Sequence, residues 1–206
     1  MTPQAVIFDI GNVLIEWQPE RFFDRVLGVE QRNALFAEVN LHAMNDVVDR
    51  GADFRDTVYA CAETYPAWRD AIRMWHDNWL DLATPEIAHS VRLLRALRVK
   101  AVPVFALTNF GIGTFALAEP RYPFLGEFDR RYISAQLGVI KPDPEIYAMV
   151  EADCGIAPQA LLFTDDRADN IAAAKTRGWQ AHLFEGPLGW AQVLVDQGLL
   201  TREEAA

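Results

Sequence analysis

Short apolar segments that end in polar residues recur along the chain and constrain its fold more than any other feature. Four of these segments have the length of a β-strand: residues 5–10, 101–107, 160–164 and 180–184. Near-continuous apolar strands are typical of parallel sheets that are covered on both faces. Helical patterns separate the strands, at residues 85–98, 144–154 and 168–177. This alternation predicts a doubly wound α/β fold with a parallel sheet.

The stretch between about residues 19 and 82 breaks the alternation. Its aromatic and aliphatic residues recur at helical spacing, as in Trp68, Ile72, Trp75 and Trp79, and no convincing strand pattern is present. A helical insert after the first strand would hang over the carboxyl ends of the strands, where open α/β sheets bind ligands. We therefore expect an α/β core of residues 1–15 and 83–206 and a small helical subdomain of residues 16–82.

The charge balance excludes several kinds of partner. The 206 residues carry a formal net charge of −10, whereas nucleic acids and anionic membranes attract clustered cations, so we expect neither partner. No apolar run approaches the roughly 18 residues of a membrane span, and the N-terminus lacks a secretory signal pattern. Two cysteines, Cys61 and Cys154, fit neither a disulfide framework nor a zinc motif, so a reducing cytoplasm is the expected location. The sequence does not indicate an oligomeric state.

Polar residues at the ends of the apolar segments are the candidates for chemistry. Asp9 ends the first segment, Thr108 and Asn109 follow the second, and Asp165 and Asp166 follow the third. A single aspartate at a strand end is most often only a turn former. Three parallel strands, however, place such residues along one edge of the sheet, so we expect these side chains to converge.

Gathered carboxylates need a compensating charge. Asp9, Asp165 and Asp166 would repel one another unless they shared protons or a cation lay between them. Mg²⁺ suits such a site because it is bound by one or two carboxylates and keeps waters and phosphate oxygens. A carboxylate can also act as a covalent nucleophile. Lys141 is one of only three lysines and precedes a Pro-Asp-Pro turn that restricts the backbone, so it is a candidate cation for the site.

Four segments together resemble the haloacid dehalogenase (HAD) superfamily, in the order that this family shows. They are residues 6–14 (VIFDIGNVL), 105–109 (FALTN), 138–143 (GVIKPD) and 163–170 (FTDDRADN). The helical insert is similar to the cap that subfamily I places after the first strand. The resemblance implies a HAD-like hydrolase, and most simply a Mg²⁺-dependent phosphatase of a small phosphorylated metabolite, with a sugar phosphate as one candidate.

The resemblance also implies roles for the catalytic residues. Asp9 would be the nucleophile and would form an aspartyl-phosphate. Thr108 and the backbone around Asn109 would hydrogen-bond the phosphoryl oxygens. Lys141 would neutralise charge on the nucleophile and on the transferring group, so positioning and electrostatic stabilisation would supply most of the rate.

Further residues are implied at the metal. Asp9 and Asp166 would ligate Mg²⁺ directly, and the backbone carbonyl of Gly11 could also do so. Asp165 and Asn170 would support the metal or hold its waters.

Gly11 is a departure from the pattern. Phosphatases of this family usually carry a second aspartate at that position, as general acid and base, although a Gly-Asn-Val variant resembles a subgroup of small sugar-phosphate phosphatases. Loss of general acid–base catalysis costs about 10²–10⁴ in rate. We therefore expect slow turnover of substrates with poor leaving groups, while activated aryl phosphates should suffer least.

Alternatives remain open at this point. A 2-haloacid dehalogenase would use Asp9 without a metal, but such enzymes resemble Asp-x-Tyr-Gly-Thr in the first segment and carry fewer acids in the fourth. A non-catalytic protein that only binds a phospho-ligand is a second alternative because of Gly11. A receiver domain is a third, although its acidic pair precedes the phosphoacceptor strand. For substrate binding we single out only Trp17, at the entry into the insert, and Arg50, in a turn of the insert.

Overall fold

The central sheet of the computed structural model, which describes residues 2–206, consists of five parallel strands in the order β5-β4-β1-β6-β7. The strands are β1 (Ala5–Phe8), β4 (Val104–Thr108), β5 (Arg130–Ile133), β6 (Leu161–Asp165) and β7 (Gln180–Leu183). Phe8, the last residue of β1, pairs in register with Ala106 of β4 and with Thr164 of β6, so the carboxyl ends of the three central strands lie at one edge of the sheet. The predicted α/β fold with a parallel sheet is confirmed.

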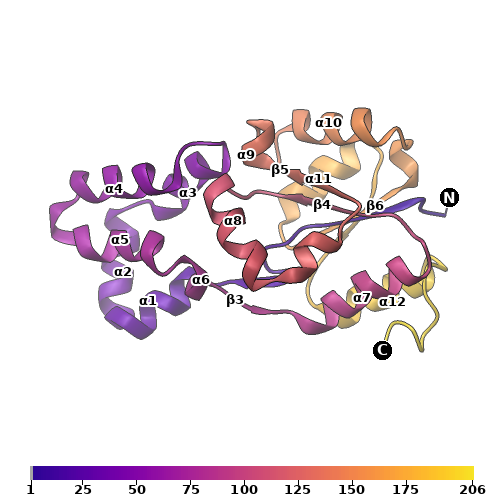
Figure 1. Cartoon of the computed structure of the whole chain (residues 1–206), viewed down its shortest axis with the longest axis horizontal. Coiled ribbons are helices and arrows are strands. Elements are labelled where there is room, and N and C mark those ends of the chain that lie inside the picture. The colour runs from indigo at the N-terminus through magenta and orange to yellow at the C-terminus, as the bar shows by residue number, and fades with distance from the viewer. Residues whose placement is uncertain (1) are drawn as a thin grey trace.

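Helices cover both faces of this sheet (Figure 1). Val6 and Phe8 share one apolar cluster with α7 (Ala88–Val99) and α12 (Pro187–Asp196). Ala5 and Ile7 share the other cluster with α10 (Pro144–Cys154) and α11 (Ala168–Thr176). Side chains alternate between the two faces of a strand, so an uninterrupted apolar segment is required for burial on both sides. The remaining helices of this part are α8 (Ile112–Arg121) and α9 (Ser134–Leu137).

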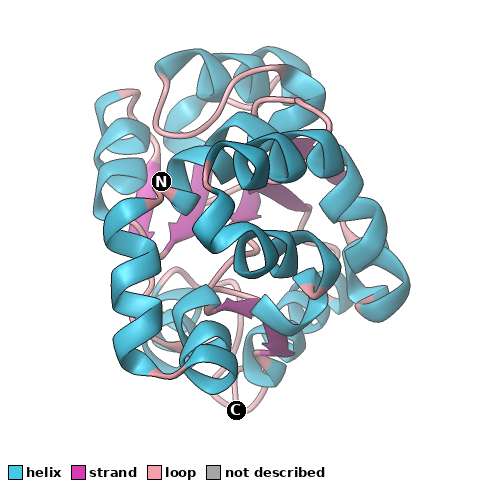
Figure 2. Ribbon diagram, turned by 90° about the vertical axis from the view of Figure 1, so that its left-hand side faces the viewer, coloured by secondary structure: helices cyan, strands magenta, loops and turns pink. Residues whose placement is uncertain are grey.

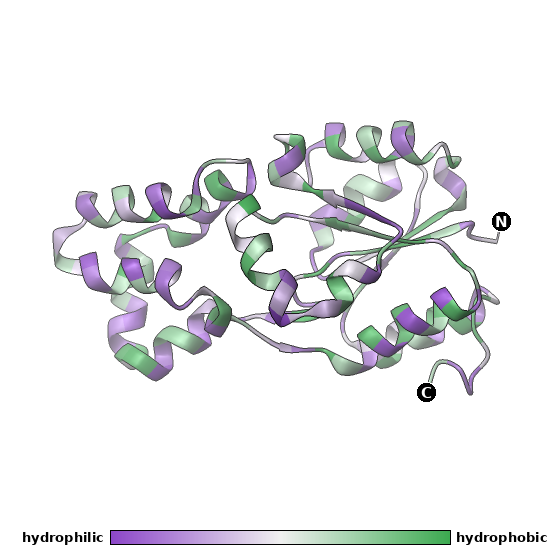
Figure 3. Cartoon of the chain, viewed as in Figure 1, coloured by the Kyte–Doolittle hydropathy of each residue, from purple (hydrophilic) through white to green (hydrophobic). Residues whose placement is uncertain are grey.

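Residues 19–82 form a lobe of helices beside the sheet, called here the helical insert (Figure 1). Its helices are α1 (Pro19–Leu27), α2 (Val29–Glu38), α3 (Leu41–Asp49), α4 (Phe54–Thr64), α5 (Arg69–Asp77) and α6 (Trp79–Leu82). The end view in Figure 2 shows the strands enclosed by helices, and Figure 3 shows apolar and polar residues alternating along the helices of the insert. Trp75 is fully buried in the apolar core of the insert.

The chain enters and leaves the helical insert through a pair of short antiparallel strands. These are β2 (Ile15–Trp17) and β3 (Ala83–Glu86), in which Ile15 pairs with Glu86 and Trp17 with Ala83. We call this two-stranded connection between the helical insert and the sheet the hinge.

Several element boundaries differ from the sequence-based prediction. The helix predicted to begin at Pro85 begins at Ala88, because the residues before it pair with β2. The strand predicted from Ala101 begins only at Val104, since Ala101 has a positive φ of 56°. Strand β5 was not predicted because it is an edge strand that opens with two exposed arginines. Among residues 2–206, no helix has the length and apolar character needed to span a bilayer.

Candidate active site

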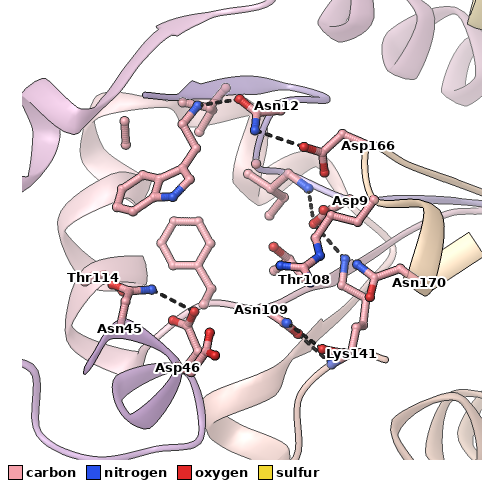
Figure 4. Close-up of a pocket in the computed structure, with 18 of the residues that line it drawn as sticks. Asp9, Asn12, Asn45, Asp46, Thr108, Asn109, Thr114, Lys141, Asp166 and Asn170 are labelled. Carbon is pink, nitrogen blue, oxygen red and sulfur yellow. Dashed lines mark hydrogen bonds and ion pairs between the residues drawn. The ribbon is translucent and has the colours of Figure 1, made fainter. Parts of the chain in front are cut away.

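Of the residues predicted at the strand ends, Asp9, Thr108, Asn109 and Asp166 line one pocket of about 360 Å³, to which the helical insert also contributes, whereas the fully buried Asp165 lies behind its wall. Asp9 follows β1, Thr108 ends β4, and Asp166 follows β6, while Lys141 comes from the loop before α10. Figure 4 shows these side chains from separate elements gathered around one space. The position agrees with the general rule that open α/β sheets bind ligands at the carboxyl ends of their strands.

Lys141 is a buried cation with all three of its N–H donors engaged. Its Nζ donates to Leu107 O at 2.9 Å and to Asp165 Oδ2 at 2.6 Å, and it lies 3.0 Å from Asp9 Oδ1. Burial alone would lower the pKa of Lys141, but the carboxylates of Asp165 and Asp9 outweigh it and raise this pKa. The ammonium group therefore stays charged and is aimed at Asp9.

Asp9 is 7% exposed and is held by its Oδ1 atom. This oxygen accepts a hydrogen bond from the backbone N–H of Ile10 at 2.7 Å, in addition to its ion pair with Lys141. The pKa of Asp9 is raised to about 7, chiefly by burial; Lys141 opposes this rise, and the neighbouring Asp165 and Asp166 add to it. An additional cation would therefore be needed to keep Asp9 fully ionised at neutral pH.

Asp165 is completely buried and acts as the anchor of the acidic group. Its Oδ1 accepts from the backbone N–H of Arg167 at 2.8 Å and from Asn170 Nδ2 at 2.9 Å. Its Oδ2 accepts from Lys141 and from the same Asn170 amide, the latter at 3.0 Å. Because both oxygens are already engaged, Asp165 orients Lys141 and Asn170.

Asp166 is half-buried and lies next to Asp9 and Asp165. Burial raises its pKa, and a hydrogen bond from Asn12 to its Oδ2, at 2.9 Å, opposes that shift. Asp9, Asp165 and Asp166 each present an oxygen atom within 4.8 Å of the others. With Lys141 as the only buried cation beside these three carboxylates in the described part of the chain, negative charge is in excess, and a hard divalent cation such as Mg²⁺ fits the donor set.

Thr108 and Asn109 differ in what their side chains are free to do. Thr108 is 1% exposed, and its hydroxyl has no hydrogen-bond partner within residues 2–206. Asn109 is engaged on both sides of its amide, since Nδ2 donates to Lys141 O at 2.9 Å and Oδ1 accepts from Lys141 N at 2.8 Å. The Asn109 side chain therefore fixes the lysine loop, whereas the Thr108 hydroxyl is available to a ligand.

The helical insert adds residues that the sequence analysis did not single out. Helix α3 lines the pocket with His42, Asn45, Asp46 and Asp49. Their spacing of i, i+3, i+4 and i+7 places them on one helix face, and this polar stripe could have indicated them. Figure 4 shows Asn45 and Asp46 across the space from Asp9.

Asp49 is the buried side chain among these four. It is 7% exposed and accepts a hydrogen bond from Asn45 Nδ2 at 2.8 Å. Burial, and secondarily repulsion from Asp46, raise the pKa of Asp49 to about 7. Its backbone carbonyl accepts from Ser134 Oγ at 2.6 Å, which ties the end of α3 to the sheet domain.

Of the two residues predicted to bind substrate, Trp17 lies in the wall of the pocket and Arg50 lies outside it. Trp17 lines the pocket and packs against Trp79 at a ring-centroid distance of 6.0 Å. Arg50 is not one of the residues that line the pocket, because its guanidinium forms an ion pair with Asp143 at 3.0 Å. Asp143 directly precedes α10, but its side chain binds Arg50 and does not cap the helix.

Residues 3–178 match the sequence model of the haloacid dehalogenase-like hydrolases. The match covers most of the chain and all four segments on which the resemblance was based. The chain therefore belongs to the haloacid dehalogenase-like hydrolase family, and it is an enzyme of that family.

Individual relatives are phosphatases by name. A D-ribitol-5-phosphate phosphatase from Bacteroides thetaiotaomicron is 38% identical over 66 residues, which make up 32% of this chain and 32% of the relative. The chain thus matches about a third of the length of that relative. A sesquiterpene phosphatase from Aspergillus oryzae is 26% identical over 178 residues, 86% of this chain and 87% of the relative.

Solved structures share the fold over nearly the whole chain. A HAD family enzyme from Bacteroides thetaiotaomicron superposes with a TM-score of 0.74 at 22% identity, covering 94% of this chain and 99% of that one. The same enzyme in complex with magnesium and inorganic phosphate gives a TM-score of 0.69 at 21% identity, over 93% and 98% of the two chains. The L-2-haloacid dehalogenase from Xanthobacter autotrophicus gives 0.61 at 19% identity, over 96% and 84%. At these identities the likeness establishes the fold alone.

Proposed function

We propose that the protein is a Mg²⁺-dependent phosphomonoesterase of a small phosphorylated metabolite, with Asp9 as the covalent nucleophile. The observation that carries the proposal is the excess of carboxylate charge around Lys141. Asp9, Asp165 and Asp166 have oxygens within 4.8 Å of one another, and one buried ammonium group cannot balance them. A divalent cation and an anionic phosphoryl group complete this charge balance together.

Two steps follow from this arrangement. A carboxylate oxygen of Asp9 attacks phosphorus, the ester P–O bond breaks, and the alcohol leaves with a proton from solvent. Water then attacks the aspartyl-phosphate, which releases inorganic phosphate and restores Asp9. Lys141 stabilises the charge that develops at the phosphoryl group, and the free hydroxyl of Thr108 donates to a phosphoryl oxygen.

The metal would be held by Asp9, Asp166 and the carbonyl of Gly11. When bound, Mg²⁺ supplies charge neutralisation and orientation of the phosphoryl group. Asp165 and Asn170 hold Lys141 and the start of α11 in place, through the hydrogen bonds described above. We assign the helical insert the role of a subfamily I cap, and Trp17 a place in the wall of the substrate pocket.

The donor set favours a phosphatase over a dehalogenase. A 2-haloacid carries a carboxylate, and a metal-free site with three neighbouring carboxylates would repel that anion. The phosphatase names of two relatives, one of which aligns over 86% of the chain, also support phosphate ester hydrolysis.

Hydrolysis of p-nitrophenyl phosphate by the full chain tests the proposal. We expect phosphate release that requires Mg²⁺, stops with EDTA and is lost in Asp9→Asn. Release of chloride from 2-chloropropionate without a metal would replace the proposal with dehalogenation. If neither product forms while inorganic phosphate raises the melting temperature, the protein is a binding module.

A further inference from the structure

Asn12 occupies a backbone position that few side chains adopt, in the turn that follows Asp9. Its φ is +55°, a left-handed conformation that asparagine tolerates better than most residues other than glycine. In the sequence it lies between the candidate nucleophile and the hinge strand β2, and Figure 4 shows its side chain beside Asp166. None of the roles assigned so far accounts for an asparagine at this place.

Both ends of the Asn12 amide are engaged, and by partners of opposite type. Its Nδ2 donates to Asp166 Oδ2 at 2.9 Å. Its Oδ1 accepts from the backbone N–H of Trp17 at 2.9 Å and from Gln18 Nε2 at 3.3 Å. A carboxylate oxygen can only accept here and a backbone N–H can only donate, so the network fixes the orientation of the amide.

The first of these bonds constrains how Asp166 can meet a cation. With Oδ2 engaged by Asn12, Oδ1 is the oxygen left for a metal. Monodentate coordination suits the strict octahedral geometry of Mg²⁺. A hydrogen bond to the second oxygen of a ligating carboxylate is the kind of outer contact that orients metal ligands, and its loss typically costs 10–100-fold in metal affinity.

The second bond connects the same amide to the hinge of the helical insert. Trp17 ends β2, and the adjacent Gln18 N–H donates to Leu82 O at 2.9 Å, where the chain returns from the insert. The indole of Trp17 packs on Trp75 and Trp79 of the insert, at centroid distances of 5.6 and 6.0 Å. A single amide thus joins Asp166 to the place where the insert is attached.

We propose that Asn12 is a positioning residue that holds Asp166 with one oxygen toward the metal and couples that carboxylate to the hinge at Trp17. This inference rests on the proposed function, because it takes Asp166 as a metal ligand. The coupling has a direct consequence. Cation binding at Asp166 is expected to make the Trp17 backbone less mobile. Loss of the Asn12 amide is expected to weaken cation binding and to make the Trp17 backbone more mobile.

The test compares Asn12→Gly with the wild type in the full chain. Glycine adopts the same φ without strain, so this variant removes all three hydrogen bonds of the Asn12 side chain while it keeps the turn. Asn33→Gly, a matched change on the exposed face of α2 outside the pocket, serves as the control. Calorimetric titration with Mg²⁺ alone measures affinity, and hydrogen exchange of the segment around Trp17 is measured with and without Mg²⁺.

We expect Asn12→Gly to weaken Mg²⁺ binding about 10-fold or more, and Asn33→Gly to leave it within about twofold. In the wild type Mg²⁺ should slow exchange of the Trp17 amide, and in Asn12→Gly this amide should exchange fast with or without Mg²⁺. The inference would be overturned if Asn12→Gly bound Mg²⁺ with unchanged affinity. It would also be overturned if the Trp17 amide of the wild type exchanged at the same rate with and without Mg²⁺. A wild type that binds no Mg²⁺ and hydrolyses no phosphate ester would instead overturn the proposed function.

A second variant covers the case in which Asn12→Gly does not fold. Asn12→Asp has the same shape and keeps an oxygen opposite the Trp17 N–H, but it removes the donor to Asp166. In the metal-free protein its Trp17 amide should exchange as slowly as in the wild type. Fast exchange in this variant would show that the side-chain oxygen does not hold the hinge, and would also overturn the inference.

Discussion

The Nζ atom of Lys141 lies 3.0 Å from Oδ1 of Asp9, and the lysine side chain is only 1% exposed. The two residues are distant in the sequence, and each would be costly to bury alone. Asp165, which is 2.6 Å from the same ammonium group, makes the burial possible by supplying a second acceptor. This ion pair organises the site and leads to the first prediction.

Lys141→Met should reduce both activity and stability. Removal of one partner from a buried ion pair leaves uncompensated charge and costs about 3–5 kcal/mol. We also expect kcat/KM for p-nitrophenyl phosphate to fall at least about 100-fold, since the transferring phosphoryl group loses its cation. Urea denaturation and steady-state kinetics measure the two effects. The exposed Lys175→Met is the control, and a stable, active Lys141→Met would contradict the role of this lysine.

Gly11→Asp should restore general acid catalysis. An added Cβ at Gly11 would meet only Trp17 Cβ, at 3.9 Å, so the pocket has room for a side chain. We expect kcat/KM for alkyl phosphates to rise about 10–100-fold, as general acid catalysis typically contributes 10²–10⁴. p-Nitrophenyl phosphate, whose leaving group needs little protonation, should change far less.

The comparison variant is Gly11→Asn, which has the same shape but no acidic proton. An equal rise for aryl and alkyl phosphates, or a rise in Gly11→Asn, would show that the gain does not come from proton transfer.

Asp49→Asn should remove a pH-dependent loss of stability. The pKa of Asp49 is raised from 3.8 to about 7, so between these values the folded state binds more protons than the unfolded state. The free energy of unfolding of the wild type should therefore fall, relative to the variant, as the pH rises from about 4 to 7. Above pH 7 the variant should be more stable by about 2–4 kcal/mol.

Urea denaturation of both proteins at pH 5 and pH 8 measures this difference. Asp46→Asn is the matched control: it removes the repulsion but leaves the burial of Asp49, which is the larger cause of the shift. Most of the pH dependence should survive in that control. A stability difference between Asp49→Asn and wild type that is the same at both pH values would refute the assignment.

Arg50→Ala should have little effect. The side chains of Arg50 and Asp143 are 47% and 46% exposed, and ion pairs of this kind contribute at most about 1 kcal/mol. We expect kcat/KM to stay within about twofold of the wild type. A large increase in KM would mean that Arg50 leaves Asp143 to bind the substrate.

Part of the fold and site followed from local patterns. The apolar residues 5–8 and 161–164 had to become strands buried on both faces, and parallel pairing then brought Asp9 and Asp166 to one edge of the sheet. Strand β5 escaped prediction because Arg130 and Arg131 make it resemble an exposed loop, and only pairing with β4 makes it a strand. Pro85 was predicted to begin a helix but lies in β3, because the strand that pairs with it, β2, is about 70 residues earlier in the sequence.

The sequence by itself determined the α/β alternation, the helical character of residues 19–82 and the polar residues at the strand ends. These depend on periodicity within one segment, which neighbouring residues set. The tertiary structure decided which face of α3 meets the pocket, that Arg50 is paired with Asp143, and that Asn12 joins Asp166 to Trp17. Such contacts depend on the relative placement of segments up to 154 residues apart, and no local pattern encodes that placement.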